Sequence, residues 1–254
     1  MVHLQESYLA YLWAMIYSTF VIYERGVQER LMKGVFDGTI EYNRPELSRA
    51  KYLGDWARCF AFEYEPWDEG MLPNPRRHAD ALEQQLACKA NAIFLRAVTY
   101  LIAHEFGHLS GRHNVDTSDI ERIEQEKEAD NFALAFLVDG EASDPEKLVS
   151  GAALVILTCS NLFLTADFPQ IWNRRHPHTH DRIRNAISGL NLTSQQSKDY
   201  LYYLAAIGLR QYLDSKELES RAPIADRAED LFLWYLDRYD ELRASLDASP
   251  SVRK

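Results

Sequence analysis

The sequence element that most constrains this chain is the pentapeptide His104-Glu105-Phe106-Gly107-His108, which lies in a long apolar segment with helical spacing. Residues four apart on an α-helix lie nearly one above the other, so His104 and His108 can offer two imidazole nitrogens to one zinc ion. Glu105 then stands beside the ion, where it can take a proton from water. Because such a pentapeptide also arises by chance, the zinc assignment requires a further ligand elsewhere in the chain.

The composition is that of an ordinary globular protein, with 46% hydrophobic and 26% charged residues. The net charge of −10 argues against nucleic acid as a partner, because phosphate recognition requires clustered Lys and Arg. Three scattered cysteines favour free thiols in a reducing compartment over a disulfide framework. We therefore expect a soluble cytoplasmic protein.

An uncharged apolar run from Tyr8 to Tyr23 raises the question of a membrane segment. The run is shorter than the roughly 18–20 residues that cross a bilayer, and it lacks the basic flank of a secretory signal. We interpret it as a buried core helix, with a membrane-associated segment and a partner-binding helix as the alternatives. No membrane partner is expected.

Hydrophobic spacing predicts a mainly α fold, a single zincin-like helical domain over residues 1–254 with a very small β-sheet. An N-terminal helix and an irregular segment occupy 1–75, the zinc-site core 76–190, and C-terminal helices 191–254. The candidate strand is Arg58–Tyr64, which alternates and could hold a substrate along its edge. The helices are expected near residues 4–32, 75–110, 119–138, 144–166, 180–190, 195–213 and 223–245.

A catalytic zinc usually takes three protein ligands and leaves one position for water. The metzincin pattern HExxHxxGxxH does not supply the third ligand, since Asn114 stands where its last histidine belongs. The helix opened by Ser118 offers a better candidate, because one of its faces combines carboxylates with apolar residues. That face comprises Glu126, Ala129, Asp130, Ala133, Leu134 and Leu137. The sequence therefore places two carboxylates among residues that should pack in the core.

A carboxylate on a buried face requires a partner, and a metal held by histidines would supply one. We predict that Glu126 ligates zinc and that Asp130 accepts a hydrogen bond from a ligand imidazole, which fixes its tautomer. Glu128 points elsewhere and is the weaker ligand candidate. The alternative is that Glu126 and Asp130 lie at the edge of a solvated face.

Three elements of the chain together resemble the gluzincin-type metallopeptidases of the HtpX and CAAX-prenyl-protease group. The pentapeptide, Glu126-Lys127-Glu128-Ala129-Asp130 and His176-Pro177…Arg182-Ile183 are similar to the HExxH, ExxAD and HPxxxxRI elements of that group. The resemblance implies that His176 lies near the metal, where it steadies an oxyanion or occupies the open coordination position. It also implies that Arg182 orients His176 or the ligand helix.

The chain resembles, more loosely, the Lit-type phage-exclusion peptidases. That resemblance implies a bacterial protein that cleaves a host translation factor during infection and is held inactive until a partner activates it. The HtpX and CAAX-prenyl-protease proteins span the membrane several times, whereas this sequence shows no convincing span.

These observations predict a zinc-dependent endopeptidase with Zn²⁺ as cofactor, Glu105 as general base, and a protein or peptide as substrate. The alternatives are a non-catalytic zinc-binding regulatory or interaction module, a helical interaction protein, and a zinc hydrolase that acts on another substrate. Two packing expectations accompany the site. Phe106 should face the core, and Gly107 should lie where another backbone crosses closely. His113 belongs to no pattern and is interpreted as an ordinary residue.

Overall fold

The computed structural model describes residues 5–60, 63, 65–114, 116–140, 143–164, 179–218, 225 and 227–247. Helices make up most of these residues, and the described ranges contain no strand. The prediction of a mainly α fold is confirmed, while the expected small sheet is not found in this part of the chain.

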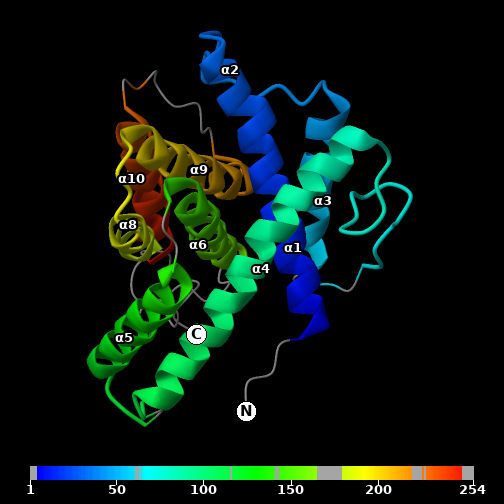
Figure 1. Ribbon diagram of the computed structural model, residues 1–254. Helices are drawn as coiled ribbons and strands as arrows, with labels where there is room; N and C mark the ends of the chain where they lie inside the picture. Colours follow the sequence, from blue (N-terminus) through cyan, green and yellow to red (C-terminus); the bar gives the residue numbers. More distant parts are fainter. Residues whose placement is uncertain are drawn as a thin grey trace.

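The elements in chain order are α1 Glu6–Val21, the π-helix η1 Ile22–Gln28, α2 Glu29–Met32, α3 Pro45–Phe60, α4 Ala81–Ser110, α5 Asp119–Val138, α6 Asp144–Leu164, α8 Thr179–Gly189, α9 Gln195–Ser215 and α10 Ala228–Asp247. Helix α6 packs against α1, α4, α8 and α9 and so lies at the centre of the fold. Helices α4 and α5 pair with each other at one edge, as Figure 1 shows.

Helix α1 is a core helix. Every residue from Tyr11 to Val21 is buried, and the helix packs against α3, α4 and α6. The interpretation of the N-terminal apolar run as a buried helix is therefore confirmed. Within the described residues, α4 and α6 are the two helices that are long and apolar enough to cross a membrane, with 39% and 67% of their most apolar stretches buried. Core helices of soluble proteins share these properties, so this finding carries no membrane assignment.

The segment between α2 and α4 is more regular than the sequence suggested. Helix α3 occupies 16 residues of it, and Arg58–Phe60, expected as the start of a strand, form its last turn. Ala61, Phe62 and Tyr64 lie outside the described residues. Gly54 is buried inside α3, and a Cβ there would lie 2.5 Å from Oγ of Ser18 on α1. This glycine allows two helices to approach closely and does not mark a turn.

Helix α4 begins later than expected. The helix does not begin near residue 75 as predicted, and the Asn74 side chain accepts hydrogen bonds from the backbone N–H groups of Arg76 and Arg77 at 2.9 and 3.2 Å in the loop before α4. Asp80 caps the helix by accepting from the backbone N–H of Glu83 at 2.8 Å. Ser118 opens α5 as predicted, through a capping box with Glu121.

Candidate active site

The candidate site lies where α4 and α5 approach each other most closely. A Cβ built on Gly107 would lie 3.1 Å from Cα of Ala129, so any larger residue would require the two backbones to move slightly apart. The expectation of a close backbone crossing at Gly107 is confirmed. Since α5 also buries Glu126 one turn before Ala129, the crossing brings this carboxylate opposite the histidines of α4.

His104, His108 and Glu126 form a converging set of donor atoms. Nε2 of His104 lies 3.1 Å from Nε2 of His108 and 3.4 Å from Oε2 of Glu126, and Nε2 of His108 lies 3.5 Å from Oε1 of Glu126. One donor atom from each residue lies within 4.8 Å of the other two. His104 is 8% exposed and Glu126 9%. Two imidazoles and one carboxylate are a donor set that suits a catalytic zinc, so the residues present fit that ion.

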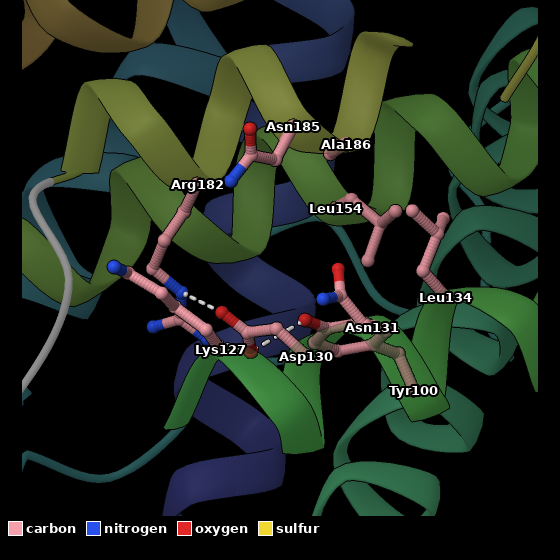
Figure 2. Close-up of a pocket in the computed structure, with 9 residues that line it drawn as sticks. All are labelled: Tyr100, Lys127, Asp130, Asn131, Leu134, Leu154, Arg182, Asn185 and Ala186. Atoms are coloured by element: carbon pink, nitrogen blue, oxygen red, sulfur yellow. Dashed lines mark hydrogen bonds and ion pairs between the residues drawn. The ribbon is translucent and has the colours of Figure 1, made fainter. Parts of the chain in front are cut away.

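Asp130 connects this set to a third helix. Arg182 on α8 donates from Nε to Oδ2 at 2.8 Å and from Nη2 to Oδ1 at 2.7 Å, and the Tyr100 hydroxyl donates to Oδ1 at 2.7 Å. Figure 2 shows Arg182 and Tyr100 meeting the carboxylate from opposite sides, beside a cavity of about 30 Å³. Oδ1 also lies 3.0 Å from Nδ1 of His104. This contact leaves Nε2 of His104 facing the other two donor groups.

The charges of this cluster shift one another's proton affinities. Burial by itself would lower the pKa of His104, but hydrogen bonds to Asp130 and Glu126 outweigh it and raise that pKa to about 9. Burial would raise the pKa of Asp130, yet its contacts with His104 and Arg182 lower it. The same carboxylate raises the pKa of Arg182 above its usual range despite burial. Burial lowers the pKa of His108. Asp130 is therefore an anion and Arg182 a cation at neutral pH.

His113 and Glu128 extend the site on its other side, which the sequence interpretation missed. Nδ1 of His113 lies 2.8 Å from Nδ1 of His108, and Nε2 of His113 lies 3.1 Å from Oε2 of Glu128. One tautomer satisfies all three groups: His108 donates to His113, which donates to Glu128, and Nε2 of His108 stays unprotonated.

The turn after α4 places the His113 ring. Gly111 leaves room for it, since a Cβ at Gly111 would lie 2.4 Å from Nε2 of His113. Arg112 adopts a left-handed conformation with φ of 53°, and the His113 N–H donates to the carbonyl of His108 at 3.1 Å. Two sequence signals could have identified His113 and Glu128. Gly111 precedes His113 by two residues, and Glu128 follows Glu126 by two.

The remaining predicted residues fall as follows. Glu105 is exposed beside the buried His104. Arg182 contacts Asp130 on α5, the helix that carries Glu126, and orienting that helix is one of the two roles that the resemblance implied for it. His176 lies outside the described residues. The expectation that Phe106 faces the core is wrong: its side chain is 56% exposed and contacts Phe132 of α5 with ring centroids 6.0 Å apart. The α4–α5 pair lies at the edge of the fold, and none of the described helices covers its outer face.

We expect His113 to support metal binding through His108. Replacing His113 with alanine removes the group that holds Nδ1 of His108, so zinc affinity should fall about 10- to 100-fold. Competition with a chromophoric chelator measures this change, and Glu128→Gln should lower affinity in the same direction. Glu124→Gln, an exposed carboxylate on the same helix, is the matched control. An unchanged zinc affinity in His113→Ala would contradict this role.

Comparison with known proteins identifies a family for the chain. The family described as peptidase U49 matches residues 2–205, which include both α4 and α5 and extend to about the middle of α9. Comparisons with curated proteins and with solved structures gave no match. Since the matched region covers most of the chain, this protein belongs to the peptidase U49 family.

Proposed function

We propose that this peptidase is a zinc-dependent endopeptidase. The observation that carries the proposal is the convergence of Nε2 of His104, Nε2 of His108 and a carboxylate oxygen of Glu126, with Glu105 adjacent in sequence. Zinc held there supplies a water with a pKa near neutrality and polarises a substrate carbonyl. Membership in a peptidase family supports a peptide bond as the bond that is cleaved.

Glu105 is the general base of the proposed reaction. Its side chain is exposed, whereas the neighbouring His104 is buried, so Glu105 can reach water and substrate beside the donor set. Its carboxylate takes a proton from the attacking water and later returns that proton to the leaving amine. Glu105 is not one of the converging donor residues, which leaves its oxygens available for this transfer.

Asp130 and Arg182 are positioning residues in this proposal. The Asp130 carboxylate fixes the His104 ring, and Arg182 fixes the carboxylate with two hydrogen bonds. An imidazole ligand held through a buried ion pair keeps its orientation between turnovers, which lowers the cost of reorganising the site. The role of His176 near an oxyanion remains a proposal from the sequence resemblance.

The biological setting is a proposal of the same kind. The likeness to Lit-type phage-exclusion peptidases supports a cytoplasmic enzyme that cleaves a host protein and that a phage component or partner protein activates. If this is right, the purified protein should cleave generic peptides slowly until its activator is added.

Zinc content tests the metal assignment directly. Elemental analysis of protein purified without chelator should give one zinc per chain in the wild type and a large loss in His104→Ala and Glu126→Ala. Glu124→Ala, on the exposed side of α5, should retain the metal. Absence of zinc from the wild type would contradict the proposal, and full occupancy in Glu126→Ala would exclude Glu126 as the third ligand.

A further inference from the structure

A second cavity of about 550 Å³ lies between α1, the first half of α4 and the loop that precedes α4. Its apolar walls are the aromatic side chains of Trp13, Trp67 and Phe94 together with Leu9, Ala10 and Pro75. Cavities of this size and composition bind small molecules or side chains of larger ligands. None of the residues assigned to the metal site lines it.

The walls of this cavity are held together by specific contacts. The Trp13 indole donates to the Asn91 side chain at 2.7 Å, and Asn91 donates to the carbonyl of Pro75 at 3.2 Å. Asn91 therefore ties α1, α4 and the loop to one another. Trp13 also lies against Trp67, with ring centroids 5.6 Å apart. The cavity is formed before any ligand enters, which reduces the entropy that binding would cost.

A line of side chains on α4 connects the cavity to the candidate active site. Positions 94, 98, 101 and 105 are spaced by four, three and four residues and so share one face of the helix. Phe94, Val98 and Leu101 are half-buried, and Glu105 is exposed. The line is thus an apolar strip that begins at the cavity and ends at the proposed general base.

Helix α1 borders the cavity from the other side. Leu9 and Ala10 line the cavity. Burial raises the pKa of the neighbouring Tyr8 to about 12, and the positive charge of Arg182 partly opposes this rise.

We propose that the cavity is a specificity subsite of the peptidase, which receives an aromatic side chain of an extended polypeptide substrate. The proposal rests on the proposed function. The eleven residue-to-residue steps along α4 from Phe94 to Glu105 cover about 16 Å. An extended chain advances about 3.3 Å per residue, so the aromatic residue lies about five residues from the cleaved bond.

The chemistry of the lining favours an aromatic side chain over a charged one. The three aromatic walls offer stacked and edge-to-face contacts to a further ring. Four charged residues line the cavity. Arg77 forms an ion pair with Glu69, and the charges of the other two, Arg76 and Glu6, sum to zero. The lining therefore carries no excess of either charge that would select an acidic or a basic residue.

Binding of defined peptides tests the subsite apart from catalysis. The probes are capped decapeptides of Ala, Gly and Ser that carry a single Phe, Lys or Glu at each position in turn, and the protein is the zinc-loaded Glu105→Gln variant. Phe peptides should bind at least several-fold more tightly than Lys or Glu peptides. Phe94→Ala, which removes a wall, and Ala10→Trp, which fills the cavity, should each abolish this preference. Leu95→Ala is the matched control, since Leu95 is 64% exposed and does not line the cavity.

Cleavage of the same peptides by the wild type, mapped by mass spectrometry, gives the second readout. Bonds about five residues from Phe should be cleaved preferentially. Equal binding of Phe, Lys and Glu peptides, or a Phe preference that survives both cavity variants, would overturn the subsite. Cleavage without this spacing would overturn the subsite and leave the proposed function intact. Cavity-dependent Phe binding without any cleavage would support the aromatic site and contradict the proposed function.

Discussion

Replacing Glu105 with glutamine should abolish peptide cleavage while one zinc ion per chain remains bound. Glutamine has nearly the same shape as glutamate but cannot take a proton from water at neutral pH. The side chain is exposed and is not part of the converging donor set, so the substitution should disturb neither the fold nor metal binding. Loss of a general base typically lowers the rate about 100- to 10,000-fold.

The comparison requires wild type and variant with equal zinc content, assayed on the same unfolded protein substrate. Glu121→Gln, which alters an exposed carboxylate at the first turn of α5, serves as the control and should cleave at the wild-type rate. Cleavage at the wild-type rate by a folded, protease-free Glu105→Gln preparation would refute the proposed role of Glu105.

Replacing Arg182 with methionine should destabilise the fold by about 3–5 kcal/mol, since removal of one member of a buried ion pair leaves its partner's charge uncompensated. Methionine preserves much of the packing of the arginine stem, so the loss isolates the guanidinium. Asp130 keeps Tyr100 and His104 as partners but loses both hydrogen bonds from Arg182. Urea unfolding of the metal-free protein at neutral pH measures the difference.

The difference between wild type and Arg182→Met should also depend on pH. The folded protein lowers the pKa of Asp130, so this carboxylate contributes stability that is present above its unfolded pKa and is lost as pH falls through the folded one. The stability gap between the two proteins should therefore narrow in acid. Arg184→Met, on the exposed face of α8, should change stability by no more than about 0.5 kcal/mol. Equal losses in the two variants would contradict a specific Asp130–Arg182 contribution.

Helical periodicity predicted most of the candidate site. The four- and three-residue spacing of α5 identified a face on which Glu126, Ala129 and Ala133 are indeed buried. Local spacing is sufficient here because a helix fixes which residues share a face before any tertiary contact forms. The same reasoning placed Gly107 at a close crossing, since glycine inside a helix is costly unless a neighbouring backbone requires the space.

The errors arose where tertiary contacts decided the structure. Gly54 and the surrounding glycines and prolines suggested an irregular segment, but Gly54 serves helix packing against Ser18 within α3. Phe106 is apolar yet exposed, because its helix pair lies at the edge of the fold. The contact between His113 and His108 depends on the left-handed backbone conformation of Arg112 in the turn. Arginine rarely adopts that conformation, so the sequence gives no reason to expect it there.

The support of Asp130 by α8 determines how large a metal-binding fragment of this protein must be. An excised α4–α5 hairpin, residues 81–138, would contain His104, His108 and Glu126, and also Tyr100 and Asp130. It would lack the guanidinium, which lies 52 positions after Asp130 in the chain. Such a hairpin would expose an unopposed carboxylate to water and lose the ring orientation that depends on it. The autonomous unit therefore extends well beyond the three residues that would hold the proposed ion.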